Sequence, residues 1–336
     1  MSTAWRGRID PPGVGDTRRW HQLVAPPRPD GPPGIALLGF ASDEGIRRNG
    51  GRPGAALGPS ALRAAMANLP VLQEQPFLYD TGDVCCTNGN LEDAQAEFAS
   101  RTRALLDLGH SVIGLGGGHE IAYASYRGLA DHVAESNSRI GIVNFDAHLD
   151  IRDHAMGNSG TPFLQAIRHA EMAGHALRYL CIGASRAANT PGLFALASRM
   201  NVDVVMDDEI DADGLPVCIH RLVAWLDNVD TVYLTVCLDV LSQSIAPAVS
   251  APNPGGIALR TLERLIEIVG GTGKARVLDI AELSPPYDQD GSTARLGARL
   301  AHRMAQGLSP HFDELDTPQS ALSGLCLPPV HTPPSR

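Results

Sequence analysis

The feature that most constrains the fold is a series of short, continuously apolar runs, each ending abruptly in polar or glycine-rich residues. Continuous apolarity, in place of strict alternation, is typical of parallel strands buried on both faces. Helix-like segments separate the runs. We therefore predict an α/β fold: a single doubly wound domain with a central, mostly parallel sheet and helices on both faces. The expected strands are residues 35–38, 112–115, 140–143, 179–182, 202–205, 232–236 and 275–278, and the expected helices are residues 59–68, 91–108, 123–134, 193–200, 217–226 and 259–269.

Proline-rich stretches distinguish both ends of the chain from its middle. Seven prolines fall within residues 1–33, and the chain finishes with the residues CLPPVHTPPSR. Such composition is typical of irregular segments. We therefore predict an irregular N-terminal arm over residues 1–33, one functional domain over residues 34–308 and an irregular C-terminal tail over residues 309–336.

Charge and hydropathy exclude several classes of protein. The net charge is −10, and no run of lysine and arginine has the length expected of a nucleic-acid-binding or membrane-binding patch. We find neither a signal peptide nor an apolar run long enough to span a bilayer, so we expect a cytoplasmic protein. The six cysteines form no CxxC pair and no regular framework, and we expect most of them to be buried thiols. The expected partner is a small-molecule substrate.

The strongest chemical signal is the segment Asn144-Phe-Asp-Ala-His-Leu-Asp150, which follows the apolar run 140–143 directly. Successive side chains of an extended chain alternate between two faces, so Asp146, His148 and Asp150 are expected to project to one side. The plain alternative is a solvated strand end. A metal site is the better interpretation, because carboxylates that become buried need a partner or a cation.

Three further motifs follow apolar runs in the same way: Gly116-Gly-Gly-His119-Glu120, Cys237-Leu-Asp239 and Asp279-Ile-Ala-Glu282. Taken alone, His119 is as readily a core or helix-start histidine as a ligand. The carboxyl ends of parallel strands meet at one edge of a sheet, however, and carboxylate and imidazole donors suit Mn²⁺. Two such ions about 3.5 Å apart can generate a bridging hydroxide near neutral pH. The predicted chemistry is metal-assisted hydrolysis.

In this order and spacing the motifs resemble the ureohydrolase superfamily, which includes arginases, agmatinases and formimidoylglutamases. The resemblance covers roughly residues 34–308 and implies two Mn²⁺ ions per subunit, a homo-oligomer, and attack of a metal-bridging hydroxide on an amidine or guanidine carbon. It implies further that Glu282 holds the amidine nitrogen and that Asp150 relays a proton to the leaving nitrogen. The ligands implied are His119, Asp146 and Asp150 for one ion and Asp146, His148 and Asp239 for the other.

One residue departs from the family's pattern. Cys237 stands where the family generally has an aspartate that bridges both metals. A thiolate can bridge, but it is a softer donor that matches Mn²⁺ less well. Two interpretations stay open: Cys237 is a metal ligand, or it is a buried thiol beside a weakened second site.

The segment after the metal motif separates the family's substrates. Ser159 stands where arginases have a histidine, and Arg152 stands where they have an asparagine for the amino-acid end of the substrate. A guanidinium suits a carboxylate, of which formimidoylglutamate has two and agmatine none. Arg47 and Arg52, in a loop that looks like that of formimidoylglutamases, are candidates for the same carboxylate pocket; surface salt bridges are the alternative for each.

The expected reaction is therefore hydrolysis of N-formimidoyl-L-glutamate to L-glutamate and formamide, a step of histidine degradation. Another guanidino or amidino hydrolase, similar to agmatinase or guanidinobutyrase, is one alternative, and a non-catalytic homologue with a degraded metal site is another. A nucleotide-binding Rossmann protein is disfavoured. Its G-x-G-x-x-G fingerprint, started at Gly114, requires a glycine at His119.

Overall fold

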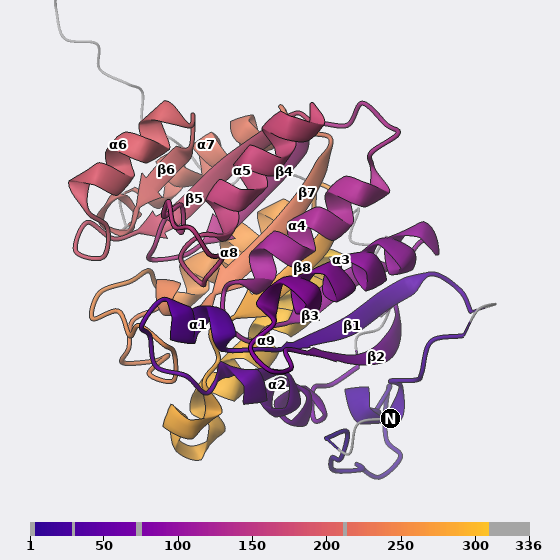
Figure 1. Cartoon of the computed structure of the whole chain (residues 1–336). Coiled ribbons are helices and arrows are strands. Elements are labelled where there is room, and N and C mark those ends of the chain that lie inside the picture. The colour runs from indigo at the N-terminus through magenta and orange to yellow at the C-terminus, as the bar shows by residue number, and fades with distance from the viewer. Residues whose placement is uncertain (1–3, 29–30, 72–75, 211–213, 309–336) are drawn as a thin grey trace, which may run out of the picture.

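The computed structural model is organised around one eight-stranded sheet in which every pair of neighbouring strands is parallel (Figure 1). It describes residues 4–28, 31–71, 76–210 and 214–308, so the predicted tail over residues 309–336 lies outside the described residues. The architecture confirms the predicted doubly wound α/β fold. The strands are β1 (Gly34–Ala41), β2 (Phe77–Cys85), β3 (Ser111–Leu115), β4 (Ile140–Phe145), β5 (Leu177–Ala184), β6 (Asp203–Met206), β7 (Thr231–Cys237) and β8 (Ala275–Ala281).

The order of strands in the sheet is β2-β1-β3-β8-β7-β4-β5-β6. After β3 the chain skips two places to form β4, continues outward through β5 and β6, and later returns to fill the gap with β7 and β8. Because all strands are parallel, their carboxyl ends share one edge. The four strands that precede the predicted chemical motifs, β3, β8, β7 and β4, are consequently neighbours at the centre of the sheet, where ligands bind in folds of this class.

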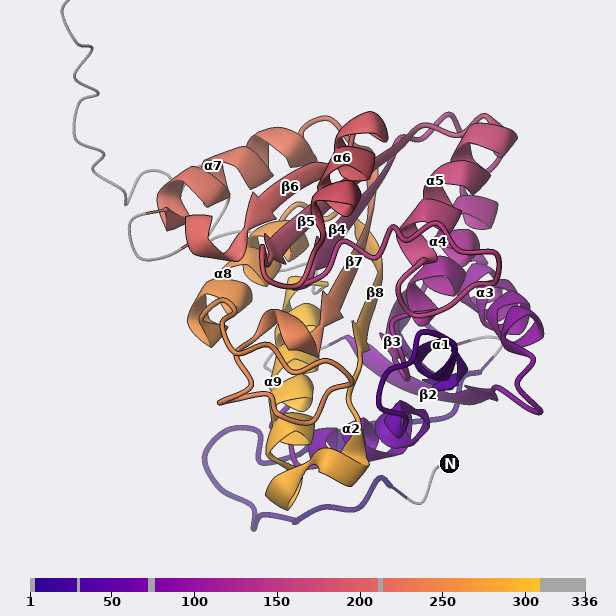
Figure 2. The same ribbon diagram turned by 60° about the vertical axis from the view of Figure 1, so that its left-hand side comes forward.

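Helices cover both faces of the sheet, as the two views in Figures 1 and 2 show. One face carries α2 (Gly58–Met66), α7 (Leu215–Leu226), α8 (Leu259–Gly270) and α9 (Ser292–Gly307), and the other carries α3 (Leu91–Asp107), α4 (Ile121–His132), α5 (Pro162–Ala173) and α6 (Pro191–Arg199). Successive strand residues therefore enter different cores: Leu37 packs into the first and Leu38 into the second. Burial on both sides explains why the strand sequences are apolar without alternation.

Among the strands and α-helices of the described residues, four were not predicted from the sequence: β2, α5, α9 and the short helix α1 (Glu44–Arg48). The edge strand β2 illustrates the reason. It contains Asp80, which is 8% exposed, and its carboxylate is paired with the guanidinium of Arg63 at 2.9 Å. Arg63 is only 1% exposed and comes from α2, so the carboxylate buried within this strand is neutralised by a residue from another element.

The N-terminal arm, although mostly irregular, is attached to the domain. Its 3₁₀ helix η1 (Trp20–Gln22) places the Trp20 side chain, which is fully buried, in the first core. Backbone hydrogen bonds join Trp20 to Leu69 and Ala25 to both Leu78 and Asp80. The arm therefore closes one end of the core next to β2. Within the described ranges, no helix has the length and apolarity needed to cross a bilayer.

We expect the substitution Trp20→Ala to lower the free energy of unfolding by about 3–5 kcal/mol, because it removes a buried indole and leaves a cavity. Urea-induced unfolding followed by circular dichroism measures this. Val14→Ala is the matched control, since the Val14 side chain lies in the same arm and is exposed, and its effect should stay within about 0.5 kcal/mol. An equally small effect of Trp20→Ala would mean that the arm is not part of the cooperative unit.

Candidate metal centre

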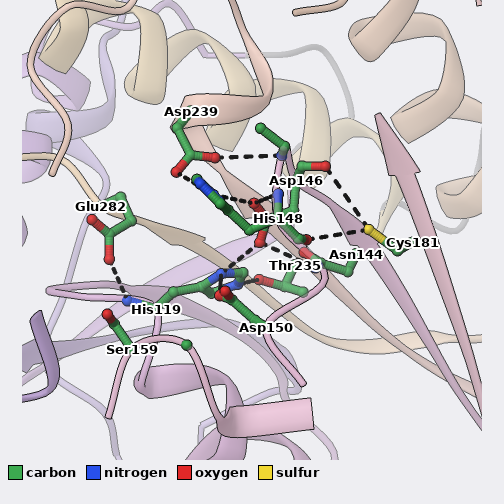
Figure 3. A network of polar contacts seen from close by, with 12 residues as sticks. His119, Asn144, Asp146, His148, Asp150, Ser159, Cys181, Thr235, Asp239 and Glu282 are labelled. Atoms are coloured by element: carbon green, nitrogen blue, oxygen red, sulfur yellow. Dashed lines mark hydrogen bonds and ion pairs between the residues drawn. The ribbon is translucent and has the colours of Figure 1, made fainter. Parts of the chain in front are cut away.

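The carboxyl ends of the four central strands bring the predicted metal-binding residues together (Figure 3). One histidine follows β3, an Asp-His-Asp set follows β4, a cysteine ends β7, an aspartate lies in the 3₁₀ helix η4 (Leu238–Val240), and a glutamate follows β8. Most of these side chains are buried. In chain order they are His119, Asp146, His148, Asp150, Cys237, Asp239 and Glu282.

Two groups of side chains have the arrangement of metal ligands. The donor atoms of His119, Asp146 and Cys237 lie within 4.8 Å of one another, and so do those of Asp146, His148 and Asp239. Asp146 belongs to both groups and is fully buried. Its carboxylate is therefore placed to bridge two cations.

The separations between donors fit shared ions. The Nδ1 atom of His119 is 2.9 Å from Oδ2 of Asp146 and 3.1 Å from Oδ2 of Asp150. The Nδ1 atom of His148 is 3.2 Å from Oδ2 of Asp239 and 3.5 Å from Oδ1 of Asp146. Two ligands each about 2.1 Å from one octahedral ion, at right angles, lie about 3 Å apart. The nitrogen and oxygen donors of both groups meet this condition.

The electrostatics of the centre also call for a cation. Burial, reinforced by the Asp146 carboxylate, raises the pKa of Asp150, and burial raises the pKa of Glu282 to about 8. For His119, burial acts to lower the pKa, but the Asp146 and Asp150 carboxylates outweigh it and the pKa is raised well above its usual range. Several carboxylates are thus desolvated close together, and bound divalent cations relieve that repulsion.

The backbone around the ligands is turned, not extended, and this corrects one detail of the sequence analysis. Strand β4 ends at Phe145, and the amide of His148 donates to Oδ1 of Asp146 at 2.8 Å. Asp150 has φ +46° and Glu282 has φ +76°, in the left-handed region that non-glycine residues rarely adopt. The predicted convergence of Asp146, His148 and Asp150 is present, but a tight turn produces it and strand alternation does not. Such backbone strain is characteristic of functional positions.

Outer hydrogen bonds hold the ligands in place, and the sequence analysis did not assign these roles. The Nε2 atom of His119 lies 3.0 Å from Oγ1 of Thr235, on β7. Asn144 donates to Oδ2 of Asp146 at 3.2 Å. Asn189 accepts from the amide of Leu149 at 3.0 Å and donates to the carbonyl of Ala147 at 2.9 Å. Thr235 and Asn144 lie next to the ligands of the predicted motifs and could have been identified from that position. These contacts of Asn189 lie about 40 residues away, and no local pattern indicates them.

Two predicted substrate-binding residues lie together in the loop after the metal ligands. The hydroxyl of Ser159, which is 9% exposed, accepts a hydrogen bond from Nδ2 of Asn49 at 3.1 Å. The amide of Arg152 donates to the carbonyl of Gly160 at 2.8 Å, and the Arg152 side chain lies against Gly160, where a Cβ would be only 3.0 Å from its Nε. Arg152 is exposed and, among the described residues, its guanidinium forms no ion pair. It is therefore available to an anionic ligand.

The other two arginines are engaged elsewhere. Arg47 is 62% exposed in its side chain and pairs with Asp43 and Glu44 on the surface. The Arg52 guanidinium donates to the carbonyls of Ser250, Pro247 and Val249, and it stacks on the Tyr287 ring at 4.2 Å. These partners favour the salt-bridge alternative for Arg47, and they show that the Arg52 guanidinium holds the loop of residues 247–250. Direct substrate binding by Arg47 or Arg52 stays a prediction.

Comparison with known proteins places the chain. The sequence pattern of the Arginase family matches residues 33–306. The chain belongs to the Arginase family. It is 44% identical to the formimidoylglutamase of Ralstonia nicotianae over 313 residues, which cover 92% of this chain and 96% of that protein. It is 45% identical to the formimidoylglutamase of Nocardia farcinica over 304 residues, 89% of this chain and 95% of that protein.

Solved structures share the fold. Formimidoylglutamase from Bacillus subtilis superimposes with a TM-score of 0.77 at 25% identity, over 91% of this chain and 97% of that one. Trypanosoma cruzi formiminoglutamase with Mn²⁺ superimposes with a TM-score of 0.74 at 23% identity, over 83% and 94%. The Arginase-family fold implies a binuclear metal site, and the two groups that share Asp146 are the candidate ligands for it in this chain.

We expect Thr235→Val to weaken metal binding by roughly 10- to 100-fold, because it removes the hydroxyl that orients the His119 ring while preserving side-chain shape. Competition against a chelator measures the loss. Thr231→Val is the matched control on the same strand, since the Thr231 hydroxyl has no hydrogen-bond partner among the described residues. Equal metal affinity in the two variants would show that the contact with Thr235 does not support the centre.

Proposed function

We propose that this protein hydrolyses N-formimidoyl-L-glutamate to L-glutamate and formamide. The observation that carries the proposal is the 44–45% identity, over about nine-tenths of the chain, to proteins that are formimidoylglutamases. The geometry supports it, because a candidate binuclear centre, a buried carboxylate and a guanidinium that forms no ion pair within the described part of the chain occur in one region of the sheet edge. The cytoplasmic location and the homo-oligomer expected from the sequence stay predictions.

The metals proposed are two Mn²⁺ ions. His119, Asp146 and Asp150 would hold one of them, and Asp146, His148 and Asp239 the other. Bound there, the ions supply Lewis acidity and increase the acidity of water. The donors around Asp146 are predominantly oxygen and imidazole nitrogen, the set that suits Mn²⁺.

Glu282 is proposed to bind and orient the formimidoyl group. Its Oε1 accepts a hydrogen bond from the His119 amide at 2.8 Å, whereas its Oε2 is buried without a partner among the described residues. An amidinium N–H would satisfy that oxygen through a charge-assisted hydrogen bond. The same contact fixes the substrate carbon relative to the metal ligands, and stabilises positive charge as the carbon becomes tetrahedral.

Asp150 is proposed to carry a proton to the leaving nitrogen. Its carboxylate lies beside the His119 ring, and its side chain retains 11% exposure, more than the fully buried Asp146. Burial and the Asp146 carboxylate raise its pKa, which favours a carboxyl group able to hold and release a proton. The products are then the free amine of glutamate and formamide.

The glutamate end of the substrate is proposed to contact Arg152 and Ser159. Arg152 offers a guanidinium that suits bidentate capture of a carboxylate. Ser159 offers a hydroxyl hydrogen, since its oxygen already accepts from Asn49. Both belong to the loop that follows Asp150, so the carboxylate contacts and the metal contacts depend on one short segment.

With Mn²⁺ restored, we expect the purified protein to release formamide from N-formimidoyl-L-glutamate.

Glu282→Gln should reduce kcat/KM by roughly 10²- to 10³-fold, because the neutral amide stabilises the charged transition state poorly. Asp150→Asn should lower kcat in metal-replete protein. Metal content per chain is measured in parallel. Urea release from agmatine, guanidinobutyrate or arginine would favour the other hydrolases, whereas fully loaded protein without any turnover would favour a non-catalytic homologue.

We expect Arg152→Gln to raise KM for N-formimidoyl-L-glutamate by roughly 10- to 100-fold with a smaller change in kcat, because hydrogen bonds between charged groups contribute about 1.5–3 kcal/mol. Steady-state kinetics measure the change in KM and the change in kcat separately. Arg47→Gln, which removes an arginine paired on the surface, serves as the control. A rise in KM for Arg47→Gln without one for Arg152→Gln would place the carboxylate pocket against α1 instead.

A further inference from the structure

The two ligand groups that share Asp146 differ in their third donor. The group formed with His148 and Asp239 contains only nitrogen and oxygen donors, whereas the group formed with His119 contains the sulfur of Cys237. Cys237 is 1% exposed and is the last residue of β7, where it is paired with Ala281 of β8. The sheet backbone therefore fixes the direction of this sulfur toward the centre.

A second buried cysteine near the centre, Cys181, provides a comparison with Cys237. The Sγ atom of Cys181, on β5, donates to the carbonyl of His148 at 3.4 Å and is fully buried. It also lies within reach of the Asp146 carbonyl and the Tyr179 side chain, and it belongs to neither ligand group. Cys237 instead faces the side-chain donors of His119 and Asp146 and lies beside the carboxylate of Asp239. The two thiols are equally buried but have different surroundings.

We propose that Cys237 makes the two metal positions chemically unequal: where both kinds of ion are present, the position of His119, Asp146 and Cys237 prefers a thiophilic divalent ion such as Co²⁺ or Zn²⁺ to Mn²⁺ more strongly than the position of Asp146, His148 and Asp239 does. Mn²⁺ fills both positions when it is the only ion supplied. The inference rests on the binuclear centre of the proposed function. Thiolate sulfur selects softer ions, and Mn²⁺ stands at the weak end of the series of divalent first-row metals. On binding, a metal–sulfur bond forms and the thiol proton leaves to solvent, without any change of oxidation state.

Cobalt makes the thiolate contact visible. Full-length protein is stripped with a chelator and titrated with Co²⁺ under anaerobic conditions. We expect a near-ultraviolet sulfur-to-cobalt charge-transfer band that saturates at one equivalent per chain. The band should be absent in Cys237→Asp and Cys237→Ser, and it should persist in Cys181→Ser, the matched control. A band that is absent from the wild type, or that is lost with Cys181 and kept without Cys237, overturns the inference.

A competition experiment tests the selectivity itself. Stripped protein is equilibrated with equal concentrations of Mn²⁺ and Co²⁺, and the bound metals are counted by mass spectrometry. The wild type should hold a higher ratio of Co²⁺ to Mn²⁺ than Cys237→Asp, in which the ratio should shift toward Mn²⁺ by on the order of tenfold, or about 1.4 kcal/mol. The same ratio of metals in both proteins would refute a selective position even if the charge-transfer band is present.

Formamide release measured on the same samples keeps this inference separate from the proposed function. A charge-transfer band together with selective metal content, but no formamide, would retain the unequal positions and refute the activity. Formamide release by protein without the band would retain the activity and refute the role of Cys237. Melting temperatures of each variant, measured with and without metal, identify any substitution that acts by unfolding the protein.

Discussion

The buried carboxylate of Asp146 is the group on which the candidate centre depends. Its Oδ1 accepts from the His148 amide at 2.8 Å, and its Oδ2 lies 2.9 Å from the His119 ring and 3.2 Å from Nδ2 of Asn144. A carboxylate with no exposed surface is stable only when charges and donors surround it. Those donors come from two different strand ends, so the position of one side chain ties β3 to β4.

Because Asp146 links the ends of β3 and β4, formation of the centre depends on the order of the strands in the sheet. Strands β3 and β4 are not neighbours; β8 and β7 lie between them and are formed much later in the chain. Strands β7 and β8 occupy the two positions between β3 and β4, and their ends contribute Cys237 and Glu282. A site that needs donors from residues 119 to 282 therefore exists only after the sheet is complete. Folding and assembly of the centre are linked by topology.

The sequence predicted seven of the strands and the clustering of the candidate ligands, because both depend on local pattern. Seven apolar runs predicted seven strands, and the motif from Asp146 to Asp150 predicted the convergence of its side chains. The features that the sequence did not predict depend on contacts with residues elsewhere in the chain. Nothing local to β2 indicates that Arg63 neutralises Asp80 within it, and nothing local to Arg52 indicates that the carbonyls of residues 247–250 hold its guanidinium. The turn after β4 was missed because the left-handed conformation of Asp150 has no signature in its side chain.

The segment beside the proposed substrate-binding residues is supported by Glu120, the residue next to the candidate ligand His119. Glu120, which follows His119 and is fully buried, accepts through Oε1 from the Ser42 hydroxyl at 3.0 Å and from the Gly45 amide at 2.9 Å. A Cβ at Gly45 would lie 2.5 Å from the Glu120 carboxyl carbon, so only glycine allows this approach.

The segment that Glu120 anchors is helix α1 with its flanking residues, and it reaches the loop after the metal ligands at two points. Arg48 donates to the carbonyl of Gly157 at 3.0 Å, and Asn49 donates to the hydroxyl of Ser159. This segment is therefore held beside His119 at one end and beside Ser159 at the other. Because the loop bearing Ser159 continues directly from Asp150, movement at either end displaces the other. The candidate metal ligands and the proposed substrate-binding residues are held in register by the same hydrogen bonds, which is the kind of support that a reaction requiring alignment within a fraction of an ångström needs.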